Sequence, residues 1–264
     1  MRCQYREQMY KCGNYLDVQI YPVFGKQSSR RKKYKPTSII QQRLNQVNAE
    51  NSFVRLVHNN FTPADLALDL TYNDKCLPES IEEAEKNLRN YLRRVKRYLK
   101  SNNLPEFKYV CVTERSGSGR VHHHLIVNGI IDRDTLEKLW GMGFANSQRL
   151  QFDEEGITAK VRYIIKNSRD EKKPPNKKRW SGSKNLIKPQ PQERTGKISK
   201  RRAKELTEAS PMEQATAFEE IYPDYCFSSV QPYYNPINNE YYFHVKMYSK
   251  GLTVKKPKRQ GGKK

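Results

Sequence analysis

The chain has 264 residues and a formal net charge of +22, from 50 Lys and Arg against 28 Asp and Glu. Such an excess of positive charge is typical of proteins that bind a polyanion, so nucleic acid is the expected partner. An acidic membrane surface is the competing partner. The sequence contains no apolar run long enough for a spanning helix and does not open on a signal peptide, so we expect a cytoplasmic protein with no membrane partner.

The cysteines are odd in number and scattered, with no C-x-x-C pair among them. This pattern favours neither a disulfide framework nor a zinc knuckle. We therefore expect free thiols at all five positions, Cys3, Cys12, Cys76, Cys111 and Cys226.

Residues 1–63 are expected to form an N-terminal extension. It contains an apolar and aromatic run from Tyr15 to Phe24, and Thr37 is a plausible N-cap for a helix that carries Ile40, Leu44 and Val47. A basic loop lies between the run and the helix. We interpret this loop as a phosphate contact, although a solvated charge run is an equally good interpretation. Its basic residues are Arg30, Arg31, Lys32 and Lys33.

Residues 64–167 have the clearest pattern, an alternation of strands and helices. Ser80 and Glu83 predict a capping box at the start of a long helix with a continuous apolar stripe. The order strand-helix-strand-strand-helix-strand predicts an α+β fold with an antiparallel split βαβ sheet of ferredoxin or RNA-recognition type. The expected strands are Leu66 to Thr71, Phe107 to Glu114, Val121 to Asn128 and Ala145 to Phe152, and a short helix runs from Asp132 to Trp140.

The hairpin between the second and third strands carries a carboxylate and three consecutive histidines. Alternate residues of a strand share a face, so His122 and His124 project together and His123 projects to the other side. With a three-residue turn, Glu114 lies opposite His122, whereas a turn of even length puts it on the wrong face unless a bulge restores it. One carboxylate and two imidazoles predict a divalent metal site with open positions. A solvated, histidine-rich loop is the alternative.

A short helix from Gly156 to Asn167 follows the last strand. Its apolar residues recur at helical spacing and predict one buried face: Ile157, Val161, Ile164 and Ile165. Tyr163 and Lys166 lie roughly opposite that face and are three residues apart, so they are neighbours on the exposed side. The alternative is a tyrosine exposed by chance.

These motifs resemble those of the HUH endonucleases, and within them the single-tyrosine rolling-circle replication initiators of bacterial plasmids and phages. The segment from His122 to His124 resembles their His-hydrophobic-His signature, with histidine in the middle place, and Glu114 matches their third metal ligand. The segment from Tyr163 to Lys166 resembles their Y-x-x-K motif, and Leu66 to Tyr72 their first strand motif. The segment from Trp180 to Leu186 resembles the one that follows their tyrosine helix. The resemblance covers about residues 64–190.

The resemblance implies metal-dependent nicking of single-stranded DNA at a replication origin. Glu114, His122 and His124 would hold Mn²⁺ or Mg²⁺, Tyr163 would form a 5′-phosphotyrosine link, and Lys166 would add positive charge beside the phosphate. The sequence has no G-x-x-x-x-G-K-[ST] run, so a host helicase and polymerase are the expected partners, and a homodimer is an option. Nucleic-acid contacts are expected from the basic loop and from Arg120, Lys160, Arg179 and Lys184.

The remaining chain divides by composition. Residues 168–210 are rich in Lys, Arg, Pro and Ser and are expected to form a loosely ordered basic linker that contacts DNA. Residues 211–250 predict a helix and a hairpin that turns at 235–239. The aromatic residues of that hairpin favour a small core or sheet edge over base stacking. Residues 251–264 are expected to form a disordered basic tail.

Three questions stay open at this level. A transposase or a conjugative relaxase uses the same chemistry, and a non-catalytic RNA or single-strand binder can use the same sheet. Only one tyrosine lies on the expected helix, so termination requires a second subunit or a water activated by a carboxylate such as Glu154 or Glu155. Imidazole ligands favour manganese over magnesium, whereas cellular supply favours magnesium.

Overall fold

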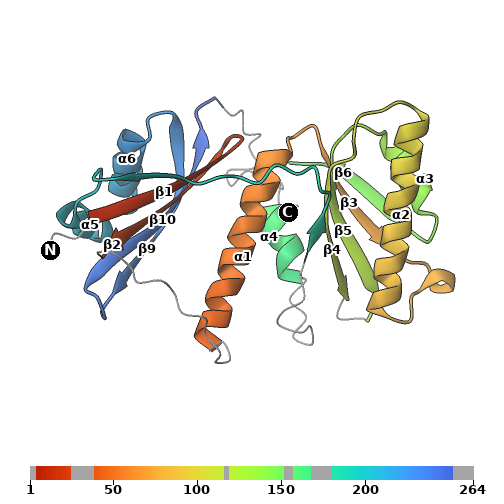
Figure 1. Cartoon of the computed structure of the whole chain (residues 1–264), viewed down its shortest axis with the longest axis horizontal. Helices are drawn as coiled ribbons and strands as arrows, with labels where there is room; N and C mark the ends of the chain where they lie inside the picture. The colour runs from red at the N-terminus through yellow and green to blue at the C-terminus, as the bar shows by residue number, and fades with distance from the viewer. Residues whose placement is uncertain (1–3, 25–38, 116–118, 152–156, 168–179, 252–264) are drawn as a thin grey trace, which may run out of the picture. The chain divides into compact units, whose positions relative to one another are not determined.

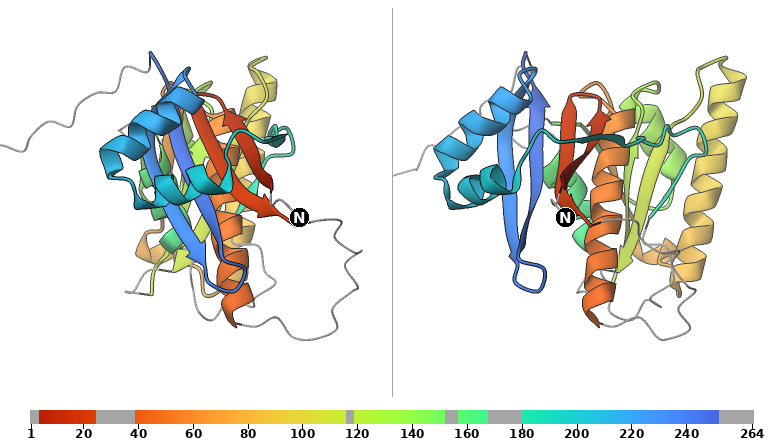
Figure 2. Two further views of the ribbon diagram at one scale, coloured as in Figure 1. Left: turned by 90° about the vertical axis from the view of Figure 1, so that its left-hand side faces the viewer. Right: turned by 60° about the vertical axis from the view of Figure 1, so that its left-hand side comes forward.

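The computed structural model describes residues 4–24, 39–115, 119–151, 157–167 and 180–251 (Figures 1 and 2). The chain divides into two compact units. One contains Asn60–Phe152 and Ile157–Ile187, and the other contains Met1–Asn59, Asp153–Gly156 and Lys188–Lys264. We call them the central unit and the terminal unit.

The central unit is built on a five-stranded sheet with the order β6-β3-β5-β4-β7, in which every pairing is antiparallel. Without β7, the chain order and the sheet order are those of a split βαβ sheet, so the predicted fold class is confirmed. Strand β7 extends the sheet at the β4 edge. The strands are β3 (Leu66–Thr71), β4 (Tyr109–Arg115), β5 (Val121–Val127), β6 (Ala145–Arg149) and β7 (Ser181–Gly182).

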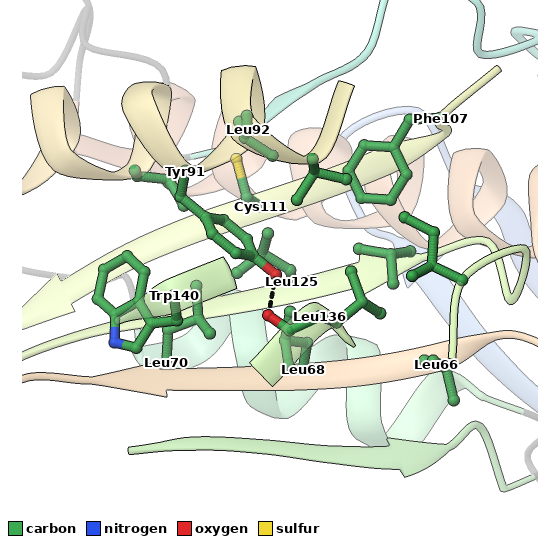
Figure 3. Close-up of a cluster of buried hydrophobic side chains, with 14 of the residues drawn as sticks. Leu66, Leu68, Leu70, Tyr91, Leu92, Phe107, Cys111, Leu125, Leu136 and Trp140 are labelled. Atoms are coloured by element: carbon green, nitrogen blue, oxygen red, sulfur yellow. Dashed lines mark hydrogen bonds between the residues drawn. The ribbon is translucent and has the colours of Figure 1, made fainter. Parts of the chain in front are cut away.

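Two helices, α2 (Ile81–Ser101) and α3 (Arg133–Trp140), cover one face of this sheet (Figure 1). Leu66, Leu68 and Leu70 alternate along β3 and pack against the apolar stripe of α2, as Figure 3 shows. The hydroxyl of Tyr91 donates a hydrogen bond to the backbone oxygen of Leu136, at 3.1 Å, and joins α2 to α3. Burying this surface is the main source of stability for the unit.

The start of α2 differs in one detail from the predicted capping box. The Ser80 hydroxyl accepts the Glu83 N–H at 3.1 Å, as expected for an N-cap. The Glu83 carboxylate accepts the N–H of Glu79 at 2.8 Å instead of that of Ser80. A short 3₁₀ turn, η1 (Asp74–Cys76), lies between β3 and α2.

The opposite face of the sheet carries α4 (Thr158–Asn167), which contacts β4. The predicted apolar stripe is buried, since Ile157, Val161, Ile164 and Ile165 are at most 2% exposed. Tyr163 is 55% exposed, in agreement with its expected place on the other side of the helix. We call this face, opposite α2 and α3, the open face.

The terminal unit contains a second antiparallel sheet, with the order β8-β1-β2-β10-β9. Helices α5 (Lys200–Glu208) and α6 (Pro211–Ile221) lie against one face (Figure 2), and α1 (Ile39–Asn60) is tied to the other by the 2.7 Å contact between Arg55 and Asp17. The strands are β1 (Gln4–Cys12), β2 (Tyr15–Val23), β8 (Gln192–Thr195), β9 (Tyr225–Asn235) and β10 (Glu240–Ser249).

This sheet changes the domain organisation expected from the sequence. Residues 1–63 and 211–250 were expected as separate extensions, whereas β2 and β10 pair directly in one sheet. Part of the expected linker at 168–210 is ordered, because Ile198, Ala203 and Leu206 are buried in the core of this unit and Ser199 caps α5. The hairpin that turns at 235–239 is confirmed.

Several expectations fall on residues outside the described ranges, among them Thr37, Cys3 and the basic tail. Within the described ranges, Cys12, Cys76, Cys111 and Cys226 are free thiols, as expected. No helix in those ranges is long and apolar enough to cross a bilayer.

Candidate active site

The hairpin of β4 and β5 has the register that a three-residue turn predicts. Glu114 pairs with His122 and Val112 pairs with His124 across the ladder. Because side chains alternate along each strand, Glu114, His122 and His124 lie on the open face. The expected convergence of one carboxylate and two histidines on one face is therefore present in the backbone register.

The middle histidine lies on the helix-covered face and is fully buried. Its Nε2 is 2.8 Å from the Tyr72 hydroxyl, and its Nδ1 is 2.9 Å from the Thr113 hydroxyl. Burial and the neighbouring histidines lower the pKa of His123 to about 3, so the ring is neutral. With both nitrogens hydrogen-bonded in the core, His123 is a structural residue, which accounts for its departure from the hydrophobic residue of the motif.

His124 is placed between two carboxylates. Its Nδ1 is 2.5 Å from Asp69 Oδ1 and its Nε2 is 2.9 Å from Glu114 Oε1. Asp69 pairs with His124 across β3 and β5, so the sheet itself brings the two residues together. The sequence pattern did not single out Asp69 as a site residue, although it belongs to the first strand motif.

The electrostatic environment of His124 is negative. Burial opposes a charge on the ring, but the hydrogen bonds to Asp69 and Glu114 outweigh it and raise the pKa of His124 to about 9. For Asp69 burial likewise favours the neutral form, and His124 and Lys160 reverse this and lower its pKa. Two carboxylates that favour a proton on the ring between them also favour a cation in the same place.

The donor set fits a divalent metal ion in one specific respect. Glu114 Oε2 is buried and has no hydrogen-bond partner in the described part of the chain. A buried carboxylate oxygen without a partner is costly, and an ion would satisfy it. Two ligands of one divalent ion lie about 3 Å apart, and His124 Nε2 and Glu114 Oε1 are 2.9 Å apart.

A complete set of ligands is not assembled. Among the described residues, no group of three or more His, Cys, Asp or Glu side chains is arranged to hold a metal ion. His122 is half-buried and lies directly opposite Glu114 in the ladder, so it is the residue placed to complete the set.

Tyr163 stands beside His124. The two rings have centroids 6.3 Å apart and meet edge to face at 76°. The phenol ring is more than half exposed, so solvent and substrate can reach it. The helix and the hairpin predicted separately from the sequence therefore bring their key residues to one place.

Lys160 is one turn before Tyr163 on α4 and contacts two members of the cluster. Its Nζ lies 3.5 Å from Asp69 Oδ2 and 5.7 Å from the centre of the Tyr163 ring. Lys160 was expected only as a DNA contact, and the structure places it beside Asp69 and Tyr163. Lys166 is in the last turn of α4, and its side chain lies outside the described residues.

The other expected nucleic-acid contacts do not all lie at this site. Arg120 is next to the site, held by Asp74 at 2.8 Å and by the backbone oxygen of Tyr72 at 2.9 Å. Lys184 is exposed in a hollow that it shares with Lys96 of α2, away from His124. The remaining expected contacts lie outside the described residues: Arg30, Arg31, Lys32, Lys33 and Arg179.

The central unit is an antiparallel split βαβ sheet with a tyrosine beside a carboxylate–histidine cluster. Residues 65–171, less than half of the chain, match the model of a family described as replication-associated protein ORF2. This segment begins just before β3, continues past α4, and contains Asp69, Glu114, His124 and Tyr163. The central unit is therefore similar to the replication-associated proteins that initiate rolling-circle replication. No curated protein and no solved structure matched the chain.

Proposed function

We propose that the central unit is a single-stranded DNA nickase and ligase that initiates rolling-circle replication through a 5′-phosphotyrosine intermediate. The observation that carries the proposal is the position of Tyr163, exposed on α4 with its ring 6.3 Å from the His124 ring. A tyrosine in contact with a carboxylate–histidine cluster has the arrangement of a nucleophile beside its activating site. The match to a replication-associated family supports the same function.

In this proposal Glu114, His122 and His124 hold Mn²⁺ or Mg²⁺. Glu114 contributes its unpaired buried oxygen, and His124 contributes Nε2 while Nδ1 donates to Asp69. A carboxylate behind a ligating histidine fixes the tautomer and orientation of its ring. When bound, the ion supplies a Lewis acid that polarises the scissile phosphate and offsets charge in the transition state.

The residues of the chain carry out the remaining steps. The Tyr163 oxygen attacks the phosphorus, loses its proton, and displaces the 3′ oxygen of the preceding nucleotide, which leaves as a hydroxyl. The phosphodiester bond is exchanged for a phosphotyrosine bond, so the reverse attack by a 3′-hydroxyl can rejoin the strand. The released 3′-hydroxyl can serve as a primer for a host polymerase.

Positive charge near the phosphate comes from α4. Lys160 already lies beside Asp69 and Tyr163, and Lys166 is assigned the same task by its place in the Y-x-x-K motif. A cation there stabilises the phenolate that forms during attack and the charge on the phosphoryl oxygens. Strand separation is assigned to a host helicase, and termination to a second subunit or to an activated water.

The test is a nicking assay on circular single-stranded DNA of the parent replicon with added Mn²⁺. The wild type should nick and retain a covalently attached protein, and a chelator should stop the reaction but leave most of the binding. Tyr163→Phe removes one oxygen from an exposed ring, so it should fold normally and bind but produce neither nick nor adduct. Nicking with adduct by Tyr163→Phe would show that another residue is the nucleophile and refute the proposal.

A further inference from the structure

Phe144 is the most exposed aromatic residue of the central unit among those described, at 80%. An isolated exposed apolar side chain is ordinary and carries no argument by itself. What distinguishes Phe144 is that its backbone is fixed on both sides while its ring contacts little of the protein. It lies immediately before β6, at the end of the sheet that carries the active site.

The backbone on either side of the ring is clamped to β3. The oxygen of Phe144 accepts the Thr71 N–H at 2.8 Å and the Thr71 hydroxyl at 3.1 Å. A Cβ at Gly143 would lie 2.5 Å from both Asn73 N and Thr71 O, so only glycine allows this close approach. Ordering the backbone here costs conformational entropy, and the ring is not buried in return. This indicates that the position of the ring has another use.

The ring belongs to the open face. Along β6 the side chains alternate: Ala145 packs on the core and Ser147 is fully buried, whereas Asn146 and Gln148 are exposed. By the same alternation Phe144 projects with Asn146, which pairs with Asp69 on β3.

Phe144 is also in line with the active site. Its neighbour Thr71 pairs with His122, and His122 pairs with Glu114. The four residues form one row across the sheet, so Phe144 is two strand spacings, about 10 Å, from His122. A base stacked on this ring would belong to a nucleotide near the phosphate that reaches Glu114 and His124.

We propose that Phe144 is a base-stacking platform that positions the single strand entering the active site. For the identity of the reaction, this inference rests on the proposed function. Aromatic rings on an open sheet face stack bases with little regard to sequence. The charge of the chain and the cationic groups Lys160 and Arg120 next to the row complement a phosphate backbone. The occupant is therefore single-stranded DNA, with its bases on Phe144 and its backbone toward α4.

The test separates bases from charge by using two fluorescent probes of equal length in the presence of chelator. One is an oligothymidylate of about 20 nucleotides, and the other is the same sugar-phosphate chain without bases. Phe144→Ala should weaken binding of the oligothymidylate about fivefold to a hundredfold and leave the abasic probe unchanged. Phe144→Trp should keep the preference for bases. Leu104→Ala, at a 38% exposed apolar residue in the loop that follows α2, is the matched control and should change neither affinity.

The stacking role of Phe144 would be refuted if the wild type and Phe144→Ala bound the oligothymidylate with equal affinity. It would also be refuted if Phe144→Ala lost the same factor of affinity for both probes. An altered sedimentation coefficient with unchanged DNA affinity would make this surface a contact between copies and also overturn it. The outcome is independent of catalysis. If the wild type forms no phosphotyrosine adduct but Phe144→Ala loses the preference for bases, the proposed function is refuted and the stacking role of Phe144 is retained.

Discussion

Each unit buries a carboxylate against a histidine on a sheet face, and the two clusters differ in how completely their oxygens are paired. In the terminal unit, Asp17 Oδ1 lies 2.7 Å from Arg55 and 3.0 Å from His244 Nε2, and Oδ2 accepts the Tyr15 hydroxyl at 3.1 Å. The Asp17 side chain is 1% exposed. Both oxygens of this carboxylate have partners and are sealed from solvent, so we call the carboxylate of this cluster saturated.

The cluster of the central unit is neither saturated nor sealed. Glu114 keeps one buried oxygen without a partner in the described part of the chain, the Asp69 side chain is 32% exposed, and Tyr163 is 55% exposed. The same residue types therefore serve two purposes. A saturated buried cluster fixes a helix on a sheet, whereas an unsaturated and accessible one is suited to bind and react.

The largest effect on stability should come from the sealed cluster. Asp17→Asn leaves the Arg55 guanidinium buried without its counter-charge, so the free energy of unfolding should fall by about 3–5 kcal/mol. Urea unfolding measures this loss, and Mn²⁺ affinity of the folded protein should stay at the wild-type value. A loss of Mn²⁺ affinity with unchanged stability would reverse the assignment of the two clusters.

A substitution in the cluster of Glu114 and His124 should change Mn²⁺ affinity strongly and stability little. Glu114→Gln preserves the shape of a side chain that already lacks one partner, so the free energy of unfolding should change by less than about 1 kcal/mol. Mn²⁺ affinity measured by calorimetry should fall by more than about 100-fold, beyond the loss that removal of an outer carboxylate causes. If the free energy of unfolding of Glu114→Gln fell as much as that of Asp17→Asn, Glu114 would be a structural residue.

Asp69→Asn should give an intermediate result. The amide can keep a contact with His124 Nδ1 but cannot hold the ring as a charged acceptor does, so Mn²⁺ affinity should fall about 10- to 100-fold. Imidazole NMR of His124 should show a lowered pKa in the metal-free variant, because one of the two carboxylates that raise it is lost. An unchanged affinity together with an unchanged His124 titration would remove Asp69 from the site.

The last prediction concerns the pH dependence of stability in the terminal unit. Burial lowers the pKa of His58 from an ordinary 6.5 to about 3, so between these values the unfolded chain binds one proton more than the folded chain. The stability that the neutral ring contributes is complete above about pH 6.5 and is lost as the pH falls toward 3, by at most about 1.4 kcal/mol per pH unit. The free energy of unfolding of His58→Gln, measured by urea unfolding at several pH values between 6 and 4, should therefore change less steeply with pH than that of the wild type. The difference should be about 1.4 kcal/mol per pH unit. Equal slopes in the two proteins would mean that His58 is protonated when folded.

Local patterns predicted the hairpin register and the tyrosine helix well. Strand alternation and turn length together fix which residues of β4 and β5 share a face, so the pair of Glu114 and His122 followed from sequence alone. Helical spacing likewise placed Tyr163 opposite its buried stripe. Whether these residues bind metal and attack phosphate is not decided by geometry and stays a prediction.

Features that depend on distant pairing could not be predicted in the same way. Asp69 meets His124 because β3 lies beside β5, a pairing that follows from the predicted split βαβ order and from no local pattern. The terminal sheet joins the two ends of the chain for the same reason. Its first hairpin did have a local signal: Gly13, with φ of +57°, and Asn14 form a two-residue turn between β1 and β2.

The central claim is that Tyr163 attacks DNA, and its most direct test is the identity of the residue that carries the covalent adduct. Wild-type protein should be incubated with Mn²⁺ and origin-containing single strands, denatured, digested with nuclease and protease, and analysed by mass spectrometry. We predict a nucleotide attached through its 5′ phosphate to the Tyr163 oxygen, and its absence in Tyr163→Phe. An adduct on another residue, or strand cleavage with no adduct in the wild type, would contradict the account.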